Sequence, residues 1–217
     1  MTTDSRLYRE TMDRITALVS GLDEKGWATV VPACPEWSVR DVLAHLAAVA
    51  DDWASGRLAG PATDEQTAAQ VARFSGVDID AILATWADAS ARLHELAETT
   101  GLEPPLGDIV IHEHDLRGAL DRPGARDSDG VRRIADELLA MLEPPVPLRV
   151  RVEDDEYRSG PDGEPELALT TTRFETLRWR TGRRSRSQLA AMDWSGDPTG
   201  VLDHLYLFGP AQADLVE

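Results

Sequence analysis

Cysteine and lysine are almost absent from this sequence of 217 residues. Cys34 is the single cysteine, which excludes an internal disulfide and any zinc site built from several cysteines. Lys25 is the single lysine, so every other basic residue is an arginine, whose planar fork suits carboxylate binding. The formal net charge of −17 argues against nucleic acid or an anionic membrane as a partner.

Long hydrophobic runs are also missing. No apolar run approaches the roughly 18–20 residues of a membrane span. The N-terminal residues MTTDSRLYRE do not have the pattern of a signal peptide. We therefore expect a cytoplasmic protein that does not enter a membrane. Hydrophobic residues make up 42% of the chain, which is enough to build a core.

Apolar residues recur at helical spacing through the first two-thirds of the chain, between short stretches rich in proline and glycine. The first such segment predicts an amphipathic helix over about residues 5–24. Ser38, with Asp41 three residues later, predicts a helix start that resembles a capping box. The whole pattern predicts an up-and-down helix bundle. Further helices are expected over 39–58, 64–75, 78–100, 106–122 and 127–142, the last capped by Asp127 or Ser128.

The pattern changes after Pro147. Alternating residues predict a strand in 148–155, a turn follows in 156–164, and β-forming residues fill 166–172. Residues 173–192 return to helical spacing with a break at Gly182, and they are followed by a loop (193–200) and a short helix or strand (201–208). We expect an α+β protein, with a helical bundle over residues 1–145 and a small mixed α/β domain over 146–217.

Three polar residues of the helical part form a candidate metal site. Asp108 and His112 are four residues apart, so both project from one face of a helix, either as half of a metal site or as a surface ion pair. His114 lies about 200° around the same helix from His112 and is expected to be an outer or surface residue. His45 lies within the apolar run of another helix. It is either a core histidine held by Asp41 or a third metal ligand.

The other histidines and the single cysteine are given no functional role. His94 is expected on a solvated helix face, and His204 is expected to pack or cap in the second domain. Cys34 is expected to be a small buried hydrophobe, because it stands between two prolines without an assured base. Trp37 is expected to anchor the start of the following helix by packing.

Two stretches resemble a known family. CPEWSVRDVLAHLAAV is similar to the Cys-Pro-x-Trp-[Ser/Thr]-Val-Arg-Asp-x-x-x-His-Leu signature of the mycothiol-dependent maleylpyruvate isomerase family. DIVIHEHDLRGAL resembles that family's second motif, in which an acidic residue precedes a histidine by four positions. The segment TTRFETLRWRTGRRSRSQLAAMDWSGD resembles the second domain of many actinobacterial members, so the resemblance covers essentially the whole chain.

The resemblance implies a DinB-like four-helix bundle that holds a divalent metal, typically zinc, on His45, Asp108 and His112. The open metal position would take the thiol of mycothiol, and the enzyme would be an isomerase or S-transferase acting on a small unsaturated acid or electrophile. The characterised isomerases carry Glu at the position of Asp108, and Asp is one methylene shorter. Such an enzyme would be a monomer or homodimer.

An anionic substrate also needs positive charge. The arginine-rich segment from 178 to 186 is the obvious source, with Arg183 and Arg184 as candidate substrate-binding residues, although these arginines equally fit a solvated helix face. Two alternatives stay open. One is a non-catalytic binding or regulatory protein stabilised by the metal, and the other is metal-assisted hydrolysis with Glu113 or Asp115 as the base.

Overall fold

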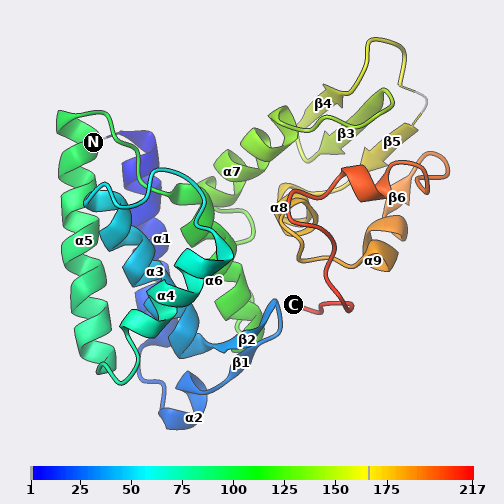
Figure 1. Ribbon diagram of the computed structural model, residues 1–217. Coiled ribbons are helices and arrows are strands. Elements are labelled where there is room, and N and C mark those ends of the chain that lie inside the picture. Colours follow the sequence, from blue (N-terminus) through cyan, green and yellow to red (C-terminus); the bar gives the residue numbers. More distant parts are fainter. Residues whose placement is uncertain (1, 166) are drawn as a thin grey trace. The chain divides into compact units, whose positions relative to one another are not determined.

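The computed structural model describes residues 2–165 and 167–217, and the chain divides into two compact units, residues 1–123 and 124–217. Unit 1 is mainly helical and unit 2 combines helices with a small sheet, as expected for an α+β protein (Figure 1). The boundary expected from the prolines lies later, after residue 145. The difference arises because helix α7 (Asp129–Ala140) packs against α8 (Arg173–Arg180) and strand β4 (Asp155–Ser159) of unit 2.

Four long helices of unit 1 pack against one another. Helix α3 contacts both α5 and α6, and α1 contacts the same two helices, so the apolar faces meet in one core (Figure 1). Ile15, Leu43, Trp86 and Ile109, one from each of these helices, are fully buried there. The helices of unit 1 are α1 (Thr3–Val19), α2 (Glu24–Trp27), α3 (Val39–Ala54), α4 (Asp64–Arg73), α5 (Ile79–Thr99) and α6 (Leu106–Ala119).

The segment between α1 and α3 differs most from the sequence-based expectation for unit 1. Helix α1 ends at Val19 rather than near residue 24, because Gly21 adopts a left-handed backbone conformation with φ of 74°. After α2 the chain forms an antiparallel hairpin of β1 (Val30–Val31) and β2 (Cys34–Ser38). The prolines of this stretch exclude a helix, as expected, but the hairpin itself was not predicted.

The predicted capping box at the start of α3 is confirmed. The Ser38 side chain accepts a hydrogen bond from the backbone N–H of Asp41, and Asp41 Oδ2 accepts from Ser38 N at 2.9 Å and Ser38 Oγ at 2.7 Å. The Asp41 carboxylate is thus turned towards Ser38. The prediction that it accepts a hydrogen bond from His45 is wrong, because His45 Nδ1 has no hydrogen-bond partner among the described residues.

A buried carboxylate ties α3 to α4. Asp52 accepts hydrogen bonds from Gln70 Nε2 at 3.0 Å, Arg57 Nε at 2.8 Å and Arg73 Nη2 at 2.8 Å. Burial alone would raise the pKa of the Asp52 carboxyl, but these three hydrogen bonds outweigh it and hold the pKa below its usual value.

Acid should therefore weaken the fold through Asp52. Because its folded-state pKa is depressed, the stabilisation is complete above the unfolded pKa of about 3.9 and is lost as pH falls through the lower folded value. We expect Asp52→Asn to lower the free energy of unfolding by about 2 kcal/mol at pH 7 and to make the decline in acid shallower. Urea denaturation at pH 7 and pH 3 measures both effects, and equal losses at the two pH values would contradict the assignment.

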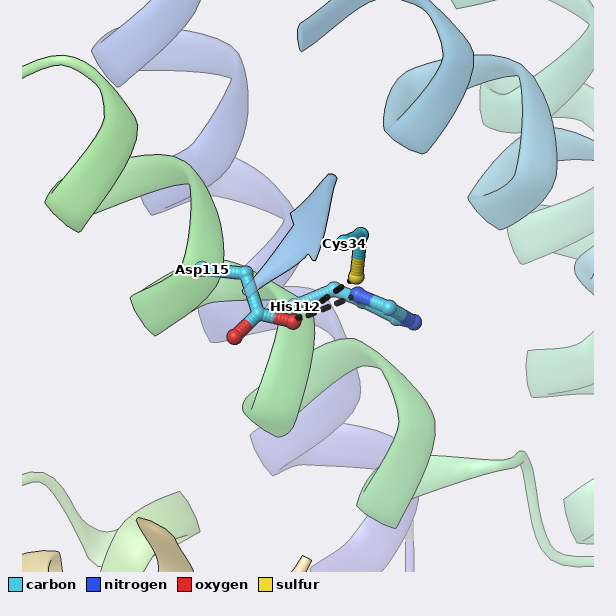
Figure 2. A group of neighbouring side chains, drawn as sticks. All are labelled: Cys34, His112 and Asp115. Carbon is cyan, nitrogen blue, oxygen red and sulfur yellow. Dashed lines mark hydrogen bonds and ion pairs between the residues drawn. The ribbon is translucent and has the colours of Figure 1, made fainter. Parts of the chain in front are cut away.

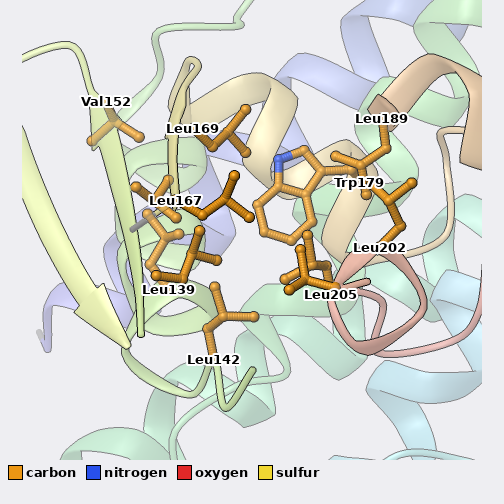
Figure 3. Packing of buried hydrophobic residues seen from close by; sticks show 12 residues of the cluster. Leu139, Leu142, Val152, Leu167, Leu169, Trp179, Leu189, Leu202 and Leu205 are labelled. Carbon is orange, nitrogen blue, oxygen red and sulfur yellow. The ribbon is translucent and has the colours of Figure 1, made fainter. Parts of the chain in front are cut away.

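The sheet of unit 2 has the strand order β4-β3-β5-β6. Strand β3 pairs antiparallel with β4 and parallel with β5, and β5 pairs antiparallel with β6. The fully buried Trp179 of α8 lies among leucines and valines from the sheet and from neighbouring helices (Figure 3). The remaining elements of unit 2 are β3 (Leu148–Val152), β5 (Leu167–Thr170), α9 (Arg186–Ala190), β6 (Asp193–Trp194) and the 3₁₀ helix η1 (Leu202–His204).

Most expectations for unit 2 are confirmed, with local corrections. Ser128 caps α7, and the helix predicted for 173–192 breaks at Gly182, whose φ is 80°. Residues 156–159 belong to β4 rather than to a turn, and the loop expected at 193–200 begins with strand β6. Residue 166, the first of the predicted β segment 166–172, lies outside the described residues. Within the described chain no helix is long and apolar enough to cross a membrane.

Candidate metal-binding site

Helices α3 and α6 bring together the three residues that the sequence singled out. His45 projects from the middle of α3, while Asp108 and His112 project one turn apart from α6. Asp108 Oδ1 lies 3.4 Å from His45 Nε2 and 3.7 Å from His112 Nε2. One donor atom from each residue can be chosen so that all three lie within 4.8 Å of one another. The shorter Asp side chain therefore reaches both imidazoles.

The three donors fit a divalent ion of the zinc type. Zinc binds imidazole nitrogen and carboxylate oxygen at about 2.0–2.2 Å, which separates neighbouring ligand atoms of a tetrahedron by about 3.4 Å. The separations of 3.4 Å and 3.7 Å from Asp108 Oδ1 are close to that value. Both histidines are buried, with 4% and 7% exposure, whereas the Asp108 side chain is 31% exposed. Three protein donors with one accessible edge are typical of a catalytic rather than a structural metal centre.

Trp37 of the β1–β2 hairpin lies against both imidazoles. Its ring centroid is 5.0 Å from that of His45 and 6.1 Å from that of His112, in tilted arrangements. The two imidazoles are themselves 5.2 Å apart, edge to face. Trp37 was expected only to anchor the start of α3. Its larger effect is to restrict the orientation of both rings and to shield them from water on one side.

Tyr8 of α1 is a buried residue near the candidate site that no sequence pattern singles out. Its hydroxyl accepts a hydrogen bond from Trp86 Nε1 at 3.1 Å. Burial raises the pKa of the Tyr8 phenol, and the negative charge of Asp108 raises it further. Tyr8 is therefore a neutral phenol, and no spacing in the sequence connects it with Asp108.

The second nitrogen of His112 faces Asp115 and Cys34 (Figure 2). His112 Nδ1 lies 2.9 Å from Asp115 Oδ2, although the contact lacks the angle of a hydrogen bond. The thiol of Cys34 donates to the same oxygen across 3.8 Å. The expectation that Cys34 is merely a buried hydrophobe is wrong, because its side chain is only half-buried and its sulfur contacts a carboxylate.

Glu113 and His114, on the other faces of α6, are buried as well. The Glu113 carboxylate is fully buried and is held by Arg14 at 2.7 Å and by Arg117 at 2.9 Å. These contacts occupy both carboxylate oxygens, so Glu113 does not fit the role of a general base. His114 is only 3% exposed, which makes the surface position considered for it wrong.

The remaining two histidines lie away from these donors. His94 Nδ1 is 2.7 Å from Ser5 Oγ, so this half-buried residue links α5 to α1 rather than standing on a solvated face. His204 is exposed in η1 of unit 2.

The arginines of residues 178–186 are largely committed to contacts inside unit 2. Arg178 is fully buried, and its Nε donates to Glu217 Oε2 at 2.9 Å. Arg184 is held by Glu175 at 2.7 Å and by Glu217 at 3.0 Å. The solvated helix face considered for this segment is therefore wrong at these positions. Arg183 is partly exposed and donates to Thr181 O at 2.6 Å. Substrate binding by Arg183 or Arg184 stays a prediction.

A helical unit with two buried histidines beside a partly exposed carboxylate, followed by a small α/β unit, defines a candidate metalloprotein of two compact parts. Residues 8–152 match the family described as the mycothiol maleylpyruvate isomerase N-terminal domain. Because this match spans well over half of the sequence, the chain belongs to that family.

Comparison with solved structures supports the fold. Crystal structures of the mycothiol-dependent maleylpyruvate isomerase and of a histidine-to-alanine mutant each align with a TM-score of 0.56, at 17% and 18% sequence identity. Each alignment covers 91% of this chain and 92% of the other. At this identity the likeness establishes the fold alone. No curated protein matches the sequence.

Proposed function

We propose that this protein is a divalent-metal-dependent thiol enzyme that uses mycothiol, either as an isomerase of the maleylpyruvate type or as an S-transferase. The observation that carries the proposal is the cluster of His45, Asp108 and His112, three donors at ligand spacing in a family defined by a mycothiol-dependent isomerase. Zinc is the ion that this donor set favours.

Each residue of the site would have its own role in holding the ion. His45 and His112 present their Nε2 atoms, and Asp108 presents a carboxylate oxygen between them. When bound, the ion would lower the pKa of a thiol and so supply a thiolate nucleophile at neutral pH. With Nε2 of His112 bound to the ion, the ring proton would reside on Nδ1, whose neighbour is Asp115 Oδ2 at 2.9 Å.

The isomerisation needs a thiol that adds to the cis double bond of the substrate and leaves again after rotation. Trp37 restricts the orientation of the two imidazoles. The buried Tyr8 phenol stays protonated, so it does not compete with the thiol as a nucleophile. The partly exposed side chain of Asp108 marks the side from which thiol and substrate would enter. The reaction consumes no thiol in the isomerase, whereas an S-transferase would leave it on the electrophile.

The finer structural and cellular expectations are part of the same proposal. The four mutually packed helices α1, α3, α5 and α6 would form the DinB-like four-helix bundle of the family. The partners would be mycothiol and a small unsaturated acid or electrophile, with no nucleic acid and no membrane. We propose a cytoplasmic protein that is active as a monomer or homodimer.

A mycothiol-dependent isomerisation assay tests the function. We expect the zinc-loaded protein to convert maleylpyruvate to its trans isomer only when mycothiol is present, and chelator treatment to lower the rate by at least about 100-fold. Zinc added back should restore the rate. Activity that survives both chelation and omission of the thiol would contradict the proposal.

Thermal melts separate the enzyme from the non-catalytic alternative. A ligand that binds the folded protein raises its melting temperature, so mycothiol should do so only in the presence of the metal. A shift caused by metal alone, with no further effect of mycothiol and no turnover, would favour a metal-stabilised binding protein instead.

A further inference from the structure

His112 belongs to two groups of potential metal ligands, one on each side of its ring. Its Nε2 faces Asp108, within the cluster of the proposed enzyme site. Its Nδ1 faces Asp115 at 2.9 Å, and the Cys34 sulfur lies 3.8 Å from the same carboxylate oxygen. A donor atom from each of Cys34, His112 and Asp115 can likewise be found within 4.8 Å of the other two (Figure 2).

Two members of this second group are buried, and one ring nitrogen among them has no hydrogen-bond partner within the described chain. Asp115 is 1% exposed and His112 is 7% exposed. His112 Nδ1 makes no hydrogen bond among the described residues, even though a carboxylate oxygen of Asp115 lies 2.9 Å away. A buried ring nitrogen without a hydrogen bond is costly, and a cation bound to it would offset that cost.

The spacing of the group suits a cation with a sulfur ligand. Zinc binds sulfur at about 2.3 Å and nitrogen or oxygen at about 2.0–2.2 Å, so tetrahedral geometry separates nitrogen from oxygen by about 3.3 Å and sulfur from oxygen by about 3.6 Å. The corresponding separations here are 2.9 Å and 3.8 Å. Thiolate and imidazole together select thiophilic ions.

We propose that Cys34, His112 Nδ1 and Asp115 form a second cation site, which takes a thiophilic divalent ion such as Cd²⁺ or Zn²⁺. Binding releases the thiol proton of Cys34 to solvent and forms a sulfur–metal bond. A neutral imidazole has one unprotonated nitrogen, so an ion on Nδ1 leaves the proton on Nε2. Occupation of this second site therefore removes His112 from the proposed enzyme site, and the two sites exclude each other.

The single cysteine makes the proposal directly testable. Because Cys34 is the only thiol of the chain, any thiolate-to-cadmium charge-transfer absorption must come from it. We expect Cd²⁺ added to the metal-free full-length protein to produce this ultraviolet absorption. The absorption should saturate at about one ion per chain. Cys34→Ser should abolish it, and His112→Ala or Asp115→Asn should weaken Cd²⁺ binding at least about 10-fold.

Two controls keep this result separate from the proposed enzyme. Asp108→Asn removes a ligand of the enzyme site alone, so it should abolish mycothiol-dependent activity and leave the charge-transfer absorption intact. His204→Ala, an exposed substitution in unit 2, should change neither. An absorption that is equal in wild type, His112→Ala and Asp115→Asn would mean that Cd²⁺ binds the lone thiol only, and would overturn the proposal.

X-ray absorption spectroscopy uses the wild-type Cd²⁺ complex, so its result does not depend on whether a variant folds. It should find one sulfur together with nitrogen or oxygen ligands around the ion. A first shell without sulfur would overturn the second site, whatever the outcome of the activity assays.

Discussion

Replacing His112 by alanine is expected to remove both the tightly bound divalent ion and the thiol-dependent activity. His112 supplies one of only three protein donors of the proposed enzyme site, and its Nε2 is 3.7 Å from Asp108 Oδ1. Mutation of groups behind the ligands of metal sites already costs about 10–100-fold in affinity or activity, so loss of a ligand itself should cost at least about 100-fold. Metal analysis of the purified protein and the mycothiol-dependent assay measure the two effects.

The histidine of unit 2 provides the matched control. His204 is exposed in η1, so His204→Ala should keep the metal content and the rate of the wild type. His45→Ala should behave as His112→Ala does, since it removes the donor from the facing helix. Normal metal content in both the His45 and the His112 variant would contradict the assignment of the site.

Glu113→Ala is expected to cause the largest loss of stability among substitutions in α6. The carboxylate is fully buried, and its oxygens are 2.7 Å from Arg14 Nη2 and 2.9 Å from Arg117 Nη2. Hydrogen bonding to Glu113 raises the pKa of Arg14, which reflects the strength of this pair. Breaking a buried ion pair from one side leaves uncompensated charge, so the free energy of unfolding should fall by about 3–5 kcal/mol.

Urea denaturation measures this loss, with Glu10→Ala as the control. Glu10 forms an ion pair with Arg6 at 2.6 Å on the surface of α1, where both side chains are about 40% exposed. Such a pair contributes less than about 1 kcal/mol. A similar small loss for Glu113→Ala would mean that the buried carboxylate does not hold α1 and α6 together.

Local sequence rules predicted the parts of the site that depend on one helix. The four-residue spacing of Asp108 and His112 placed both on one face of α6, where the structure has them 3.7 Å apart. The Ser38 capping box also followed from spacing alone. These features are set by helix periodicity and by hydrogen bonds between residues close in sequence.

Features that depend on packing between distant segments could not be predicted from local sequence patterns. The β1–β2 hairpin contains two prolines and short strands, so the sequence shows no alternating pattern that would predict it. The hairpin nevertheless positions Cys34 and Trp37 beside the histidines. Helix α6 is buried on several faces, so neither the burial of Glu113 nor that of His114 followed from its position around the helix. Arg178 and Arg184 were considered as free charge, because their common partner Glu217 is more than thirty residues away in sequence.

The boundary between the two compact units could not be predicted from local sequence either. The prolines near residue 145 suggested a domain boundary there, but α7 lies before them and packs with unit 2. Composition marks where the chain changes character, whereas the boundary between compact units is set by the contacts that each helix makes. The α+β class needed only the change of pattern after Pro147.

The central claim is that His45, Asp108 and His112 bind one divalent ion. The most direct measurement is an anomalous difference map from crystals of the zinc-loaded protein, collected on both sides of the zinc absorption edge. We expect a peak about 2.0–2.2 Å from His45 Nε2, Asp108 Oδ1 and His112 Nε2. A fully loaded protein with no peak among these three atoms would contradict it.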